Sequence, residues 1–353
     1  MAKRTKSDTS VRLIPVGCAR VSGVKVAVIG LGLIGGSLLR ALAAHGHTVT
    51  GYDLEAETRE AARALAKAAD APRVADPETR TIAVKGAWHV ADSVAEAAAG
   101  AEVVVLAVPL PALPDVLAEL EGHPGLITDV TSVKGPVRDL LKGHRFVGGH
   151  PMAGKESSSF RASDPSLFDG CAWVLCLEPG TTDVADWLSL AALFLPLGVR
   201  IVPVTAAEHD RAVAQISHVP HLLAAALAAL LEGNPLAATL GAGSFRDGTR
   251  VAGTRPELIA AMCGGNADAV REVLAGVIGD LERYDKDLHG AEAITTLTER
   301  LRPATELRQA WPPVPGSPVE LPVDAGALLA LGRAGGWVTA VDGDSISGIT
   351  AGN

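Results

Sequence analysis

The sequence of 353 residues is poor in aromatic side chains, which make up 3% of it, and it has no excess of basic ones. Lys and Arg number 31 against 40 Asp and Glu, so the formal net charge is -9. An acidic chain without a basic stripe is a poor binder of nucleic acid and of anionic membrane surfaces. Hydrophobic residues still make up 48%, which excludes a disordered chain. The length predicts two or three domains.

Long apolar runs, a signal peptide and paired cysteines are also missing. No run approaches the roughly 20 residues that span a bilayer, and the longest runs, 188–197 and 222–231, are predicted to be core helix segments. Residues 1–22 are predicted to form a disordered tail rather than a signal peptide, because they hold no apolar stretch. The four cysteines form no C-x-x-C pair and have no zinc spacing, so we expect a reduced, cytoplasmic protein without a metal.

Strand and helix signals alternate along residues 23–204. Short β-branched runs predict strands and the stretches between them predict helices, which is the pattern of a parallel α/β sheet. The predicted strands are 24–29, 48–52, 102–108, 126–130, 145–149, 172–177 and 200–204. The predicted helices are one ending near 45, then 55–69, 93–99, 111–121, 136–142 and 182–195. Residues 71–89 are predicted to be an insertion.

The pattern changes after Thr205. Helical stretches with no convincing strand follow, at 206–231, 235–240, 256–262 and 267–304. We therefore predict a Rossmann-type parallel sheet domain at 23–204 and an all-helical domain at 205–308. A Pro-rich linker, 311–318, then leads to a short C-terminal segment.

A glycine-rich turn joins the first predicted strand to the first helix. Gly30, Gly32 and Gly35, with Leu33 and Ile34 between the last two, match the dinucleotide-binding pattern G-x-G-x-x-G. The glycines permit a tight turn, a close approach of the pyrophosphate and close helix packing, and the helix N-terminus attracts phosphate. A plain strand-to-helix turn is the alternative.

Asp53 ends the second predicted strand, about 20 residues farther on. A carboxylate there accepts hydrogen bonds from ribose hydroxyls and repels a 2′-phosphate, so NAD is predicted rather than NADP. A solvated carboxylate is the alternative. Val108 and Pro109 end a neighbouring strand at the same sheet edge and are predicted to line the nicotinamide side.

Two polar segments follow later strands, and open α/β sheets bind ligands at the carboxyl ends of their strands. Ser132 lies in the first segment, 129–134, and His150 lies in the second, 148–156. A histidine beside the nicotinamide can act as a general base, because its ordinary pKa is near neutrality. The alternative is a structural histidine bonded to the backbone.

Four polar residues of the helical part, His209, Asp210, His218 and His221, form a third group. The last two share a helix face, but Pro220 is predicted to kink the helix between them and His209. Ligand binding or structural hydrogen bonding is predicted rather than a metal site, because no further ligand falls at a suitable spacing.

Arg250 lies in a fourth polar segment, 244–250. Its planar guanidinium suits a substrate carboxylate. The alternative is a surface ion pair with Asp247.

These motifs together resemble the prephenate/arogenate dehydrogenase (TyrA) family. The motifs are GLGLIGGS (30–37), DVTSVK (129–134), GGHPMAGKE (148–156), EHD…SHVPH (208–221) and SFRDGTR (244–250), in the family's order. The resemblance implies NAD-dependent oxidative decarboxylation of prephenate to 4-hydroxyphenylpyruvate in tyrosine biosynthesis, or of arogenate to tyrosine. It also implies a homodimer formed by the helical domain.

The resemblance further implies roles for the site residues. His150 would take the proton of the ring hydroxyl, Ser132 would orient that hydroxyl, and Arg250 would hold a substrate carboxylate. The residues that would shape or gate the substrate pocket are His209, Asp210, His218, His221 and Glu156. The reaction requires no metal.

Two departures from the family pattern bear on function. Ile259 stands where many relatives carry Trp, which leaves the substrate preference open. Residues 319–341 resemble only the opening of an ACT regulatory domain. Residues 309–353 are therefore predicted to be a linker and a truncated ACT-like remnant, with weak or no feedback by tyrosine.

Two other functions are less consistent with the sequence. An imine or β-hydroxyacid reductase of the same layout typically uses a lysine of the helical domain, and Lys286, the only lysine there, lies far from the polar motifs. A non-catalytic NADH-sensing regulator would need a basic nucleic-acid face or a partner tail, against which the charge of -9 argues.

Overall fold

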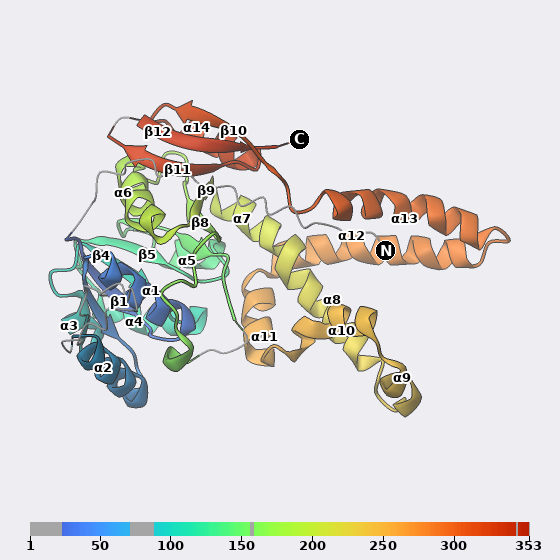
Figure 1. The fold of residues 1–353 in the computed structure, drawn as a ribbon, viewed down its shortest axis with the longest axis horizontal. Helices are drawn as coiled ribbons and strands as arrows, with labels where there is room; N and C mark the ends of the chain where they lie inside the picture. The colour runs from blue at the N-terminus through green and yellow to red at the C-terminus, as the bar shows by residue number, and fades with distance from the viewer. Residues whose placement is uncertain (1–22, 71–87, 156–158, 344, 353) are drawn as a thin grey trace, which may run out of the picture.

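The computed structural model describes residues 23–70, 88–155, 159–343 and 345–352. An α/β body carries two sheets, and a helical part extends to one side of it (Figure 1). The predicted tail and nearly all of the predicted insertion lie outside the described residues.

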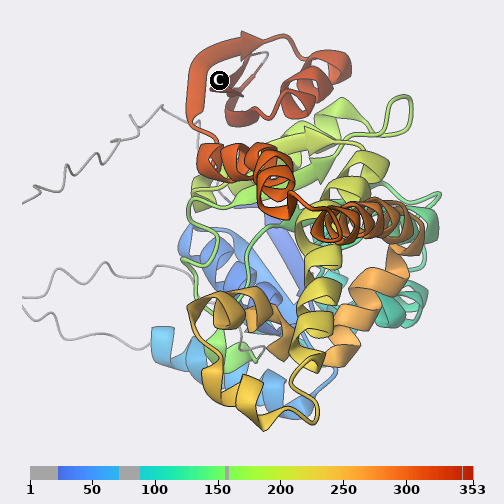
Figure 2. The same cartoon turned by 90° about the vertical axis from the view of Figure 1, so that its right-hand side faces the viewer.

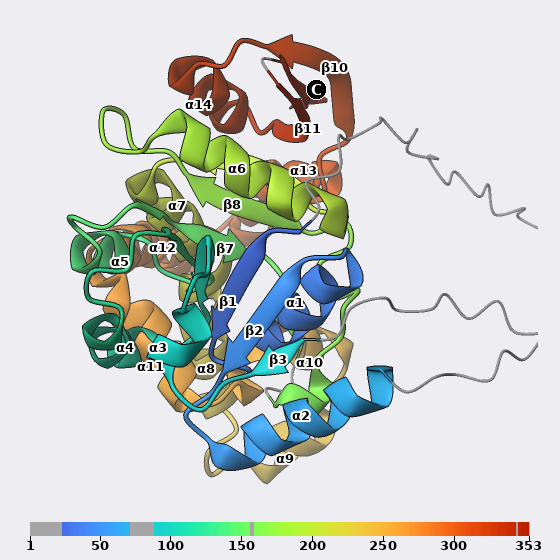
Figure 3. The ribbon, with the colours of Figure 1, turned by 90° about the vertical axis from the view of Figure 1, so that its left-hand side faces the viewer.

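The first sheet has six parallel strands in the order β3-β2-β1-β4-β5-β6, which is the order of a dinucleotide-binding sheet. Figure 3 shows β3, β2 and β1 side by side. The strands are β1 (Lys25–Ile29), β2 (Thr48–Tyr52), β3 (His89–Val90), β4 (Val103–Leu106), β5 (Leu126–Asp129) and β6 (Phe146–Val147). Five helices connect them: α1 (Leu33–Ala44), α2 (Ala56–Asp70), α3 (Val94–Ala98), α4 (Leu113–Glu119) and α5 (Gly135–Leu140). The predicted Rossmann-type sheet is confirmed.

One predicted strand, 145–149, divides between the two sheets. Its first part is β6, whereas Gly149–Pro151 (β7) belongs to the second sheet. The prediction of one strand is wrong because the change of direction falls inside a short apolar run. A Cβ on Gly149 would lie 2.6 Å from a backbone carbonyl oxygen of β5, so only glycine fits there without a shift. The division carries His150 to the border between the sheets.

The second sheet has the order β10-β12-β11-β9-β8-β7 and includes the C-terminal segment. Its other elements are β8 (Ala172–Cys176), α6 (Val184–Phe194), β9 (Arg200–Val204), β10 (Pro315–Leu321), α14 (Ala325–Arg333), β11 (Trp337–Asp342) and β12 (Ser345–Ala351). The prediction of a linker at 311–318 is wrong in part, because β10 begins at Pro315. The predicted core segment 188–197 lies in and after α6, where Leu190 and Phe194 are fully buried.

The C-terminal segment packs on the body (Figures 1 and 2). Strand β11 pairs antiparallel with β9. Helix α14 approaches β9 so closely that a Cβ on Gly332 would lie 1.8 Å from the Pro203 carbonyl oxygen. The Arg200 guanidinium lies 5.2 Å from the centre of the Trp337 ring. The segment predicted to be a truncated remnant therefore extends the sheet that carries His150.

The helical part begins at Thr205, whose side chain forms a capping box with Glu208. Its elements are α7 (Ala206–Val213), a π turn η4 (Ala214–His218), α8 (Val219–Ala229), α9 (Pro235–Leu240), α10 (Gly243–Thr249), η5 (Arg250–Gly253), α11 (Pro256–Gly265), α12 (Ala267–Leu288) and α13 (Ala293–Ala310). The last two form a hairpin that projects away from the body (Figures 1 and 2).

Residues 206–229 form a helical stretch of 24 residues that is long and apolar enough, by length and composition alone, to cross a membrane. Of its most apolar window, 28% is buried inside the fold. The prediction of a core helix at 222–231 is confirmed for the helix but wrong in part for the core. Leu222 and Leu223 pack against a buried cluster, whereas Leu227 and Leu230 are 45% and 66% exposed. The two exposed leucines leave an apolar face on the helical part.

Candidate active site

The glycine loop between β1 and α1 has the geometry of a dinucleotide-binding turn. Gly30 has a φ of 98°, and a Cβ on it would lie 2.4 Å from the Ala107 carbonyl oxygen. A Cβ on Gly35 would lie 1.8 Å from the Gly30 carbonyl oxygen, so the helix packs directly on the turn. Gly32 precedes α1 without a side-chain cap, and the first turn holds no acidic residue. The helix N-terminus is therefore open to a phosphate.

Asp53 lies just after β2 and also holds the glycine loop. One carboxylate oxygen accepts a hydrogen bond from Leu31 N at 2.7 Å, and the other accepts one from Glu55 N at 2.9 Å. Each oxygen keeps lone-pair capacity for a ribose hydroxyl. Arg59 donates to the Asp53 carbonyl oxygen at 2.7 Å and lies 3.7 Å from Asp92, so this cation is already engaged. The arrangement fits NAD better than NADP, because a 2′-phosphate would meet the carboxylate.

The other candidate cofactor residues surround the same loop. Val108 Cγ1 lies 3.0 Å from where a Cβ on Gly30 would be. Pro109 caps the turn that follows β4. Leu33 and Ile34 form the start of α1. These positions border the turn that would hold the dinucleotide.

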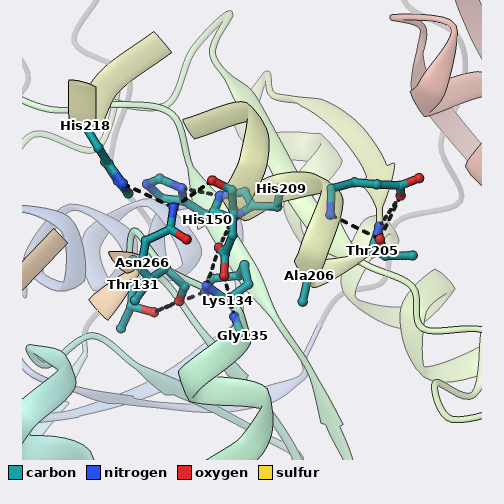
Figure 4. Close-up of polar contacts among 12 residues, drawn as sticks. Thr131, Lys134, Gly135, His150, Thr205, Ala206, His209, His218 and Asn266 are labelled. Carbon is teal, nitrogen blue, oxygen red and sulfur yellow. Dashed lines mark hydrogen bonds and ion pairs between the residues drawn. The ribbon is translucent and has the colours of Figure 1, made fainter. Parts of the chain in front are cut away.

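A hydrogen-bonded series of three side chains ends at His150 (Figure 4). His150 Nδ1 lies 2.9 Å from His209 Nε2, and His209 Nδ1 lies 2.8 Å from Asp210 Oδ1. The Asp210 carboxylate also accepts the backbone N–H groups of Lys134 and Gly135, at 2.8 and 2.7 Å. The series joins β7, α7 and the loop after β5.

These contacts determine where the imidazole protons lie. An ionised carboxylate only accepts hydrogen bonds, so His209 Nδ1 carries the hydrogen that faces Asp210. Nε2 of the neutral His209 ring then carries a lone pair. That lone pair accepts the hydrogen of His150 Nδ1, which leaves a lone pair on His150 Nε2. Among the described residues, His150 Nε2 has no hydrogen-bond partner. His150 is therefore arranged as a proton acceptor.

The surroundings keep the histidines neutral. Burial is the largest cause that lowers the pKa of His150 well below its ordinary value, and His209, Lys134 and His218 lower it further. Burial also lowers the pKa of His209, against the opposing effect of Asp210. Burial lowers the pKa of His218 to about 4. A neutral imidazole accepts protons, so His150 is in its basic form at neutral pH.

The π turn η4 separates His209 from His218. In a straight α-helix, residues nine positions apart point to roughly opposite faces, but this wide turn lies between them, and such turns are frequent at functional sites. The Asn266 amide joins the two regions, 2.7 Å from the Asp210 carbonyl oxygen and 3.3 Å from His218 Nδ1. His218 Nε2 is buried and has no hydrogen-bond partner within the described part of the chain.

Among the described residues, no hydrogen bond joins Ser132 or Arg250 to the series. Ser132 is partly exposed after β5 and Arg250 is exposed after α10, and neither has a side-chain hydrogen bond or an ion pair with the described residues. Asp247 is the alternative partner of Arg250. Its Oδ1 lies 3.9 Å from Arg246 Nε instead. Glu156 lies outside the described residues.

Among the described residues, neither His221 nor a cysteine belongs to a group that could hold a metal ion. His221 is partly exposed, and its Nδ1 lies 2.8 Å from the Ser217 carbonyl oxygen. Burial raises the pKa of the Cys171 thiol to about 11 and that of Cys176 further. In the described ranges, no group of three or more His, Cys, Asp or Glu is arranged to hold a metal ion.

Three residues of the site were not predicted as such: Asp129, Lys134 and Asn266. Asp129 and Lys134 form a buried ion pair beside the His150 backbone. A lysine so close to a buried strand is a usable signal, because a buried lysine needs a partner. Asn266 gave no signal, since an Asn before a helix is an ordinary cap.

Family models match most of the α/β body and of the helical part. Residues 73–203 match the model of the prephenate dehydrogenase nucleotide-binding domain, and residues 205–302 match that of the prephenate dehydrogenase dimerization domain. Residues 25–111 match the NAD binding domain of 3-hydroxyacyl-CoA dehydrogenase.

Individual relatives extend the match over most of the chain. Cyclohexadienyl dehydrogenase of Zymomonas mobilis is 34% identical over 275 residues, which are 73% of this chain and 86% of that protein. The structure of A. aeolicus prephenate dehydrogenase with hydroxyphenyl propionate and NAD+ has a TM-score of 0.70 at 25% identity, covering 82% and 98% of the two chains. The structure of Synechocystis arogenate dehydrogenase has a TM-score of 0.62 at 29% identity, and the match covers 81% of this chain and 97% of that chain. The chain therefore belongs to the prephenate dehydrogenase family of NAD-dependent oxidoreductases.

Proposed function

We propose that the protein oxidises prephenate with loss of carbon dioxide, giving 4-hydroxyphenylpyruvate for tyrosine biosynthesis in the cytoplasm. The observation that carries the proposal is the hydrogen-bonded series of His150, His209 and Asp210, from which we infer the lone pair on His150 Nε2. NAD+, held by the glycine loop and Asp53, supplies the hydride acceptor. The family match supports the same reaction.

The proton moves to His150 and returns. A hydride leaves ring carbon C4 with the electron pair of the C4–H bond. At the same time the C4 hydroxyl passes its proton to His150 Nε2 and becomes a carbonyl. The bond between the ring and its carboxylate then breaks, and carbon dioxide leaves. The electron pair of that bond enters the ring and reaches the carbonyl oxygen, which takes the proton back as the ring becomes aromatic. No net proton is released.

The Asp210 carboxylate offsets part of the positive charge on the ring during this interval, against the opposing effect of His209. His150 gains a positive charge when it holds the proton, and the negative Asp210 carboxylate lies at the other end of the series. Because the pKa of His150 is lowered, the proton is held only briefly, which suits a base that returns it.

Substrate contacts are part of the proposal and rest on the family resemblance. Arg250 binds a substrate carboxylate, and Ser132 bonds the ring hydroxyl. His218, His221 and Glu156 complete the pocket. The exposed Arg250 and the unpartnered His218 Nε2 support these assignments, because both have hydrogen-bonding capacity to spare.

Arogenate is the second candidate substrate, favoured by the similarity to Synechocystis arogenate dehydrogenase. Initial rates of NADH formation with prephenate and with arogenate, at matched concentrations, separate the two. A larger kcat/KM for prephenate than for arogenate supports the proposal. Turnover of arogenate but not of prephenate would refute the assignment of prephenate as the substrate. Binding of NADH without turnover of either compound indicates a non-catalytic NADH-sensing protein.

We also propose that the helical part forms a homodimer. The match to a dimerization domain supports this, as do large apolar side chains exposed on α9, α12 and α13: Leu236, Leu240, Leu281, Leu288, Ile294 and Leu307. Light scattering should give twice the chain mass of 36.1 kDa. Leu281→Asp should weaken the dimer, whereas Leu54→Asp on the body should not. A monomeric wild-type protein contradicts the proposal.

A further inference from the structure

Lys134 and Asp129 form a buried ion pair that holds both backbone polar groups of Gly149, the residue before His150. The side chains are 1% and 0% exposed. Lys134 Nζ donates to the Gly149 carbonyl oxygen at 2.6 Å, and Asp129 Oδ1 accepts from Gly149 N at 3.0 Å. Lys134 Nζ also lies 3.2 Å from Thr131 Oγ1. All three ammonium hydrogens therefore have acceptors.

The same lysine reaches the other end of the histidine series through its backbone. Lys134 N donates to Asp210 Oδ1, and Gly135 N donates to Asp210 Oδ2. One short loop thus fixes the peptide before His150 and the carboxylate that orients His209. The pair also lies at the border where β5 of the first sheet meets β7 of the second.

We propose that Lys134 and Asp129 are positioning residues, which hold His150 in the geometry for proton abstraction and keep its imidazole neutral. This rests on the proposed role of His150 as the base. A stabilising role alone is a weak explanation, because a buried ion pair is often no more stabilising than apolar residues of the same volume. Two side chains converging on one peptide beside the base point to geometry instead.

The charges around His150 support the proposal that Lys134 keeps the His150 imidazole neutral. Histidines face it from α7 (His209) and η4 (His218), and the Lys134 ammonium faces it from the loop after β5. The Asp129 carboxylate lies behind the Lys134 ammonium, and the Asp210 carboxylate lies behind His209. Like charges nearby disfavour an imidazolium. Removing the ammonium should therefore raise the pKa of His150.

The test is Lys134→Gln in the full-length protein, with Lys142→Gln as the matched control. Lys142 lies nearby, is 74% exposed and contacts only Asp139 among the described residues. We expect Lys134→Gln to lower kcat on the order of 100-fold, to leave the affinity for NAD+ within about twofold, and to move the acid limb of kcat/KM to higher pH. The control should match the wild type. A folded Lys134→Gln variant with wild-type kcat and acid limb overturns the proposal.

Two further measurements cover a variant that fails to fold. The Asp129→Asn/Lys134→Gln double variant leaves no charge buried without its partner. It should show the same loss of kcat, with a smaller shift of the acid limb, because the two removed charges have opposite effects on His150. In the wild type, nitrogen NMR of the His150 ring, assigned with His150→Asn, should show a neutral ring with the hydrogen on Nδ1 at pH values below 6.5. A His150 that titrates at 6.5 or above overturns the proposal. The NMR result needs no substrate, so it separates this proposal from a failure of the proposed reaction.

Discussion

Replacing Gly149 by Ala should displace His150 while leaving its chemistry intact. A Cβ on Gly149 would lie 2.6 Å from the Asp129 carbonyl oxygen, where an ordinary contact begins at 3.4 Å. The backbone must therefore move by about 0.8 Å, and the next residue is the proposed base. A misplacement of about 1 Å in an active site can cost on the order of 100-fold in rate. We expect kcat to fall about 10- to 100-fold.

The assay is NADH formation under saturating NAD+, with kcat and KM for prephenate determined separately. Gly154→Ala is the matched control, because a Cβ there meets no atom of the described residues within 4 Å. Thermal unfolding should show that Gly149→Ala loses about 1–3 kcal/mol, as overpacking does, and stays folded in the assay. A Gly149→Ala enzyme with kcat within twofold of the wild type would refute the reasoning, since the His150 geometry would then not limit the reaction.

Four other substitutions test separate parts of the molecule. His150→Asn should lower kcat about 10²- to 10⁴-fold, as loss of a general base does, with NAD+ affinity unchanged in a binding titration. Asp53→Asn should raise KM for NAD+ and reduce the preference of the enzyme for NAD+ over NADP+. Reaction rates with each cofactor measure this preference. Arg333→Gln removes a partly exposed ion pair with Glu208 and should cost less than about 1 kcal/mol in urea unfolding. The free energy of unfolding should fall as the pH is lowered from 6.5 to about 4, because the unfolded chain protonates His218 in this range and the folded chain does not. His218→Asn should make this pH dependence shallower.

The first sheet could be predicted because its strands are short apolar runs that end at glycine, proline or a carboxylate. The predicted strands 102–108 and 126–130 contain β4 and β5. Strand β3 could not be predicted, since two residues, His89–Val90, carry no periodic pattern. It adds the outermost strand beside β2.

The residue types of the site could be predicted, but most of its contacts could not. His150 and His209 are 59 positions apart, and their contact depends on how α7 packs on the second sheet. Pro220 marked an irregular helix, yet the irregularity is the π turn before it, at 214–218. A π turn depends on packing more than on residue type, so the sequence pattern gave no sign of it.

Proline explains why the prediction of a linker at 311–318 is wrong in part. The prolines of 311–318 predicted a linker, because proline cannot donate to a strand ladder. Strand β10 nevertheless contains Pro315 and Pro318, and it lies at the outer edge of the second sheet, where one side of the strand needs no donor. At such an edge proline also hinders pairing with another chain. The composition that argued against a strand is thus what suits this strand to the edge opposite β7, the strand that carries His150.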